Sequence, residues 1–70
     1  MKAIVEGQEV GIGDYVCFKC DIEQGAEIVA INRDLMGRTQ IRFKAPPNGF
    51  DGDYIRDSEY HTELASECWL

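Results

Sequence analysis

Val10–Ala45 reads VGIGDYVCFKCDIEQGAEIVAINRDLMGRTQIRFKA, and this stretch decides the fold. Apolar and polar residues alternate in it over three runs, 14–20, 27–33 and 38–45, with short connections between them. A period of two is typical of strands that bury one face and expose the other. We therefore expect an all-β domain, a small five-stranded SH3-like barrel with a short 3₁₀ turn before the last strand.

The alternation also predicts which side chains face the core. The expected inward residues are Val16, Phe18 and Cys20 in the first run, Ile28, Val29 and Ile31 in the second, and Thr39, Ile41, Phe43 and Ala45 in the third. Between the runs we expect a connection over Asp21–Gly25, with Ile22 turned under the sheet. A second turn is expected at Asp34–Gly37, where Gly37 can supply a positive φ.

Weaker patterns flank this stretch. Before it, Ala3–Val5 and Glu9–Ile12 are expected to pair across a turn that contains Gly7. After it we expect a loop over Phe50–Ser58 held by Phe50, Tyr54 and Ile55, a strand at Tyr60–Thr62, one 3₁₀ turn within Glu63–Ser66 and a closing strand at Cys68–Leu70. Seventy residues form one domain, 1–70.

Charge and composition narrow the classes of function. Thirteen acidic residues against seven basic ones give a net charge of −6, which disfavours non-specific binding to DNA or to an anionic membrane. An acidic mimic of nucleic acid is an alternative use of that charge. No apolar run has the length of a membrane span or a secretory leader, and the odd number of cysteines, three, fits a reducing compartment. We expect a soluble cytoplasmic protein.

Two stretches resemble a known group of proteins. Gly13-Asp14-Tyr15-Val16-x-Phe18-Lys19-x-Asp21-Ile22-Glu23-Gln24 is similar to small uncharacterised proteins of tailed bacteriophages. So is the tail, with Gly49-Phe50-x-Gly52-x-Tyr54-Ile55 and Ala65-x-x-Cys68-Trp69. This resemblance implies a phage-encoded protein in the host cytoplasm. Gly13-Asp14-x-Val16 also resembles the start of KOW and Tudor-type barrels, but the chain lacks the basic loop of KOW modules and the Ala-Leu-Tyr-Asp-Tyr stretch of SH3 domains.

Metal-binding and catalytic patterns are poorly formed. Cys17 and Cys20 have the C-x-x-C spacing of a zinc knuckle, and His61 and Cys68 could complete a Cys₃His set. However, a strand directs Cys17 and Cys20 to opposite faces, so half-buried free cysteines are the preferred reading. His61 is the only histidine, and no nucleophile–base pair or phosphate loop accompanies it. We expect neither an enzyme nor a cofactor.

A basic stripe is the main candidate for binding. Arg38, Arg42 and Lys44, with Gln40 between them, are expected on the outer face of the 38–45 strand. These residues either pair with acids on a neighbouring strand or contact a partner, with Tyr15 and Tyr54 as aromatic anchors. We expect a binding or regulatory module for another protein, as a monomer or weak dimer. A KOW- or Tudor-like nucleic-acid binder is the alternative, and a zinc-stabilised module is a third.

Overall fold

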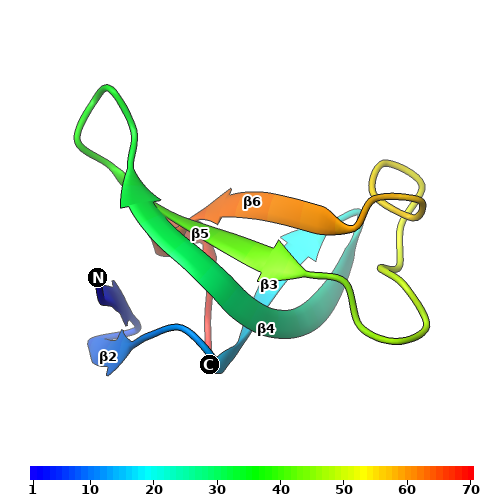
Figure 1. Ribbon diagram of the computed structural model, residues 1–70, viewed down its shortest axis with the longest axis horizontal. Helices are drawn as coiled ribbons and strands as arrows, with labels where there is room; N and C mark the ends of the chain where they lie inside the picture. The colour runs from blue at the N-terminus through cyan, green and yellow to red at the C-terminus, as the bar shows by residue number, and fades with distance from the viewer.

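The computed structural model describes residues 1–70 as a small all-β protein with six antiparallel strands in two sheets (Figure 1). A two-stranded sheet holds β1 and β2, and a four-stranded sheet has the order β3-β4-β5-β6. A 3₁₀ turn, η1, follows the last strand. The bounds are β1 Ala3–Val5, β2 Gln8–Val10, β3 Tyr15–Cys20, β4 Ile22–Arg33, β5 Thr39–Lys44, β6 Tyr60–Leu64 and η1 Ala65–Glu67.

The long strand β4 organises the main sheet because it pairs first with β3 and then with β5. A β-bulge at Val29 shifts the register between Ile28 and Ala30. The extra residue changes the phase of the alternation, so Ile28 and Ile31 both reach the core although they are three positions apart. Val29 is only partly buried.

The core is one apolar cluster that joins residues of both sheets with Phe50 and Ile55 of the loop between β5 and β6. Its fully buried large side chains are Phe18, Phe43, Ile28, Ile41, Val5 and Val16. The rings of Phe18 and Phe43 stack with their centroids 4.6 Å apart. The predicted inward faces of β3 and β5 are confirmed, with Cys20, Thr39 and Ala45 half-buried at their margins.

The predicted connection over Asp21–Gly25 is wrong. β4 already begins at Ile22, which pairs with Cys20, so Asp21 alone forms the turn. Asp21 has a φ of 69°, a left-handed conformation that aspartate tolerates better than most residues. The Ile22 side chain is 46% exposed and is not tucked under the sheet.

The flanking predictions are corrected in detail. The first hairpin turns at Glu6 and Gly7, both with positive φ. Its second strand ends at Val10, and Ile12, which was expected in the strand, lies beyond it and is exposed. In the loop between β5 and β6, Phe50 and Ile55 are buried as expected, but Tyr54 is 81% exposed and anchors nothing.

The chain end approaches β3 without forming a full strand. Trp69 makes one isolated bridge to Cys17, with hydrogen bonds of 2.8 and 2.9 Å between their backbones. The next amide, that of Leu70, donates instead to Glu6 Oε1 at 2.6 Å, so the expected closing strand is a single bridge and no closed barrel forms. The predicted 3₁₀ turn is confirmed at Ala65–Glu67. None of the chain forms a helix long and apolar enough to cross a bilayer.

Candidate binding face

The outer face of the four-stranded sheet carries a row of side chains in register. Tyr15 of β3 pairs with Glu27 of β4, Glu27 pairs with Lys44 of β5, and Lys44 pairs with Tyr60 of β6. We call these four residues the cross-strand row. All four are exposed, and the row places two tyrosines on either side of one carboxylate and one ammonium group.

The position of the Tyr15 ring depends on the absence of a side chain at Gly25. A Cβ atom on Gly25 would lie 2.5 Å from Cε1 of the Tyr15 ring, so a side chain there would displace the ring. The tyrosine ring therefore lies across the backbone of β4 at Gly25, while 67% of its surface remains exposed. A large aromatic surface that lies against a sheet but is left exposed is typical of an interface anchor.

Two shallow hollows adjoin the cross-strand row. One, of about 280 Å³, is lined by Tyr15, Ala26, Glu27, Lys44, Ala45, Pro46 and Pro47. The other, of about 360 Å³, is lined by Lys44, Ala45, Glu59 and Tyr60. Because Lys44 and Ala45 line both, the hollows form one surface that runs from Tyr15 to Tyr60.

Arg42 extends this surface. Its guanidinium carbon lies 4.5 Å from the centre of the Tyr60 ring, a cation–π contact that leaves the charge exposed. Arg42 and Lys44 stand on the same face of β5, two residues apart. Arg42 and Lys44, half of the predicted basic stripe, therefore lie on one surface with Tyr15 and Tyr60.

The other predicted binding residues lie elsewhere. Arg38 precedes β5, and its Nε lies 2.7 Å from Asp34 Oδ2 in the β4–β5 turn. Gln40 is half-buried opposite Asn32 and Leu64. Tyr54 lies on the loop between β5 and β6 and lines a different depression. The structure therefore divides the predicted set into a group at the cross-strand row and three separate positions.

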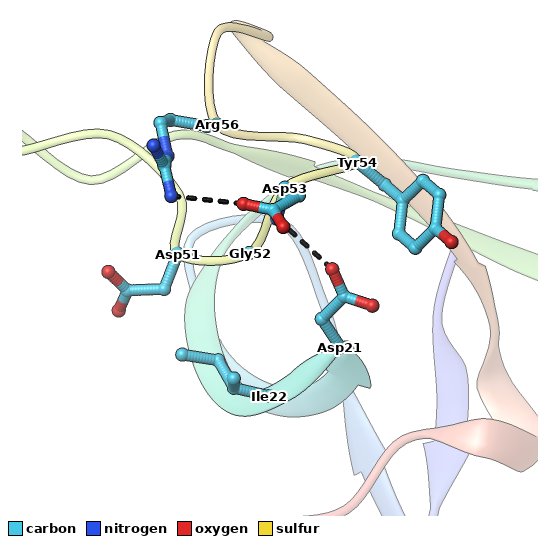
Figure 2. Close-up of a pocket in the computed structure, with 7 residues that line it drawn as sticks. All are labelled: Asp21, Ile22, Asp51, Gly52, Asp53, Tyr54 and Arg56. Carbon is cyan, nitrogen blue, oxygen red and sulfur yellow. Dashed lines mark hydrogen bonds and ion pairs between the residues drawn. The ribbon is translucent and has the colours of Figure 1, made fainter.

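The depression beside Tyr54 is wide, open and acidic (Figure 2). Asp53 donates its backbone amide to Asp21 Oδ2 at 3.0 Å, and Asp53 Oδ1 pairs with Arg56 at 3.1 Å. The side-chain amide of Gln24 both donates to and accepts from the backbone of Asp51. The contacts of Asp21 and Gln24 fasten the loop to the β3–β4 hairpin and engage the carboxylate of Asp21.

The four candidate metal ligands are not gathered into a site. The structure contains no group of three His, Cys, Asp or Glu residues placed to hold a metal ion. Cys17 is half-buried on the outer face beside Trp69, whereas Cys20 packs at the margin of the core. Cys68 is buried and its thiol donates to the Leu64 carbonyl at 3.4 Å.

His61 lies in β6 and faces the core, with its side chain 15% exposed. It pairs with Phe43 on the inner face of the sheet, stacks on Phe18 with ring centroids 5.0 Å apart, and its Nε2 lies 2.7 Å from Glu63 Oε1.

Loss of hydration raises the pKa of Cys68 to about 12, and the negative charge of Glu63 adds to that effect. Loss of hydration also raises the pKa of Cys20. Both thiols are therefore protonated and unreactive at neutral pH.

The predicted binding set omits several residues of this face, among them Glu27, Tyr60, Pro46 and Pro47. Their connection with Tyr15 depends on the register of four strands, which alternation within one strand does not provide. Gly25 was the available signal, because a glycine within a strand often marks a close approach. The fold and this face define a small all-β protein with an exposed tyrosine- and proline-lined sheet surface. Comparison with protein-family models, curated proteins and solved structures found no match to the chain.

Proposed function

We propose that this chain is a non-enzymatic binding module, built on an SH3-like barrel plan, that contacts another protein through the cross-strand row. The observation that carries the proposal is the alignment of Tyr15, Glu27, Lys44 and Tyr60 across four strands beside two adjoining hollows. The strand order β3-β4-β5-β6, the 3₁₀ turn and the return of Trp69 to β3 support the barrel plan. The resemblance of the sequence to small proteins of tailed bacteriophages supports a role in the host cytoplasm.

The composition of the face suits a protein partner. Two tyrosines and two prolines offer rigid apolar area, and Glu27 and Lys44 offer opposite charges close together. Interfaces between proteins are enriched in tyrosine and arginine, and charges of both signs fix orientation. The hollows are open and shallow, which suits a segment of a protein surface.

The test compares two double variants with matched chemistry. Tyr15→Ser/Lys44→Glu alters the cross-strand row, and Tyr54→Ser/Lys19→Glu makes the same substitutions at exposed positions away from it. Each tagged protein is used for affinity capture from bacterial lysate treated with nuclease, followed by quantitative mass spectrometry. We expect the first variant to retain less than about one tenth of the wild-type partner, and the second to retain nearly all. Equal capture by both folded variants would remove the row from the proposal.

Nucleic acid is the second candidate, and the Arg42–Tyr60 contact favours it. A cation stacked on an exposed aromatic ring, with Lys44 nearby, resembles the stacking platforms that bind single strands. A labelled single-stranded oligonucleotide tested by fluorescence anisotropy at low salt distinguishes the two candidates. Binding that weakens steeply with salt and is lost in Arg42→Glu supports this alternative, and absence of binding at low salt eliminates it.

A further inference from the structure

The tip of the β4–β5 hairpin displays two apolar side chains that the fold does not use. Leu35 is 107% exposed and Met36 is 78% exposed. We call these two residues the hairpin tip. They belong to the turn between β4 and β5, which projects from the body of the molecule at the end away from the loop between β5 and β6 (Figure 1). Because Leu35 buries no surface, folding gains nothing from its apolar character.

The turn that carries the hairpin tip is held in one conformation. Asp34 Oδ1 accepts from the amides of Met36 at 2.9 Å and Arg38 at 2.8 Å, and Asp34 Oδ2 accepts from Arg38 Nε at 2.7 Å. Backbone bonds join Asp34 and Arg38 at 2.9 Å and Gly37 and Asp34 at 3.0 Å. Arg33 Nη1 closes the base of the turn by donating to the Gly37 carbonyl at 3.0 Å. A loop ordered before binding loses less entropy when it binds.

The surroundings of the hairpin tip are basic in an acidic protein. Arg33 and Arg38 flank it, and the single carboxylate, that of Asp34, is engaged by Arg38. Arg33 forms no ion pair, so its charge is uncompensated. The local excess of positive charge contrasts with a net charge of −6 for the chain.

We propose that the hairpin tip is a preordered docking element that inserts Leu35 and Met36 into an apolar pocket, rimmed by carboxylates, on a partner protein. The basic flanks complement such a rim. An anionic membrane is disfavoured because the whole chain is acidic and two side chains give little insertion. A second copy is disfavoured because the apolar hollow of this chain is lined by Lys44 as well as Glu27, so it offers no net negative charge to the arginines of the tip.

The experiment places a photoreactive group at the tip of the full chain. One protein carries p-benzoylphenylalanine in place of Leu35, and a matched control carries it in place of Glu9, an exposed residue of β2. Both are irradiated in bacterial lysate, with unlabelled competitor proteins added in a concentration series. The competitors are the wild type, Leu35→Ser/Met36→Ser and Asp34→Ala, each first shown to be folded by its melting curve.

The expected result is a cross-linked protein that appears with the group at 35 and not with the group at 9. Wild-type chain should displace it, Leu35→Ser/Met36→Ser should be at least about tenfold weaker as a competitor, and Asp34→Ala several-fold weaker although it keeps both apolar residues. Adducts only with lipid, adducts only with a second copy, the same adducts at both positions, or equal competition by either variant would overturn the proposal. The cross-strand row lies at the other end of β5, so its variants test the proposed function separately.

Discussion

At the scale of single residues, the candidate binding face depends on the absence of a side chain at Gly25. The missing Cβ of Gly25 leaves the space in which the Tyr15 ring lies. Tyr15 is not buried there and could rotate into solvent at little cost to the fold. The effect of a side chain at position 25 should therefore be on binding and not on folding.

Gly25→Val should abolish the hollow beside Tyr15 and leave the protein folded. Valine suits a strand better than glycine by about 0.5–1 kcal/mol, so we expect a melting temperature within a few degrees of wild type. We expect partner binding to fall by about tenfold, and the Tyr15 ring signals in the NMR spectrum to move toward those of a free side chain. In a Tyr15→Ser background the same valine should cause no further loss, because the two residues act together.

Cys68 should make stability depend on pH in the alkaline range. Its pKa is about 12 in the folded protein and 9.0 ordinarily, so above pH 9 the unfolded chain releases the thiol proton before the folded chain does. The contribution of Cys68 is therefore complete below pH 9 and is lost progressively toward pH 12. Denaturant titrations should show a steeper alkaline loss of stability in wild type than in Cys68→Ala. Parallel profiles for the two proteins would contradict this assignment.

At the scale of elements, the strands with regular alternation were predictable and the irregular joints were not. The inward face of β5 follows from Ile41 and Phe43 alone. The single-residue turn at Asp21 and the bulge at Val29 do not follow, because each depends on pairing between strands. The same holds for the candidate binding face. Alternation identifies Arg42, Lys44 and Tyr15 as outward residues, but their proximity to Tyr60 depends on the register between β3, β4, β5 and β6.

Gly52→Ala should loosen the loop between β5 and β6. A Cβ atom there would lie 2.7 Å from the Cys20 carbonyl oxygen, and the backbone has a φ of +100°. Gly13→Ala is the control, because its φ of +95° is similar and no atom lies within 4 Å of its Cβ position. The control should cost about 1 kcal/mol from backbone strain, and Gly52→Ala about 1–3 kcal/mol more from the clash. Equal unfolding free energies in denaturant would show that the loop does not rest on the β3–β4 turn.

Acid should disorder the β4–β5 turn before the sheet. The amide of Arg38, followed by its side chain, stabilises the Asp34 carboxylate and holds its pKa below the ordinary value of 3.8. The turn's stabilisation is therefore complete above that value and is lost as pH falls through the folded-state pKa. The amide signals of Met36 and Arg38 should shift there in NMR spectra, and Asp34→Asn should lack that transition. Unchanged amide shifts in wild type down to acid unfolding would show that the carboxylate does not hold the turn.

At the scale of the whole molecule, the two ends of the chain complete the core together. Ala3, Val5 and Cys68 are buried in one cluster, and Leu70 bonds to Glu6. Sequence patterns placed a 3₁₀ turn and a closing strand at this end, and the structure has the turn and a single bridge to β3. They also predicted that Ala3–Val5 pairs with the segment after Gly7, which is confirmed, but not that this hairpin forms a sheet of its own.

Removal of Cys68–Leu70 should therefore strongly destabilise the protein. The truncation deletes a buried side chain and exposes the edge of β3 at Cys17. We expect a cost of about 2–5 kcal/mol, which is a large part of the roughly 4–10 kcal/mol that stabilises a domain of this length. Removal of Leu70 alone, which loses one exposed hydrogen bond, should cost about 1 kcal/mol or less. Thermal denaturation followed by circular dichroism distinguishes the two, and a melting temperature of the longer truncation close to that of wild type would contradict the role of this segment.

An NMR titration distinguishes binding through the cross-strand row from binding elsewhere on the protein. The isotopically labelled chain is titrated with the protein recovered by affinity capture, and amide shifts are mapped on the sheet. We expect the largest amide shift changes at Tyr15, Glu27, Lys44 and Tyr60, and no changes in the Asp51–Arg56 depression. Changes confined to that depression, with an unperturbed row, would contradict it.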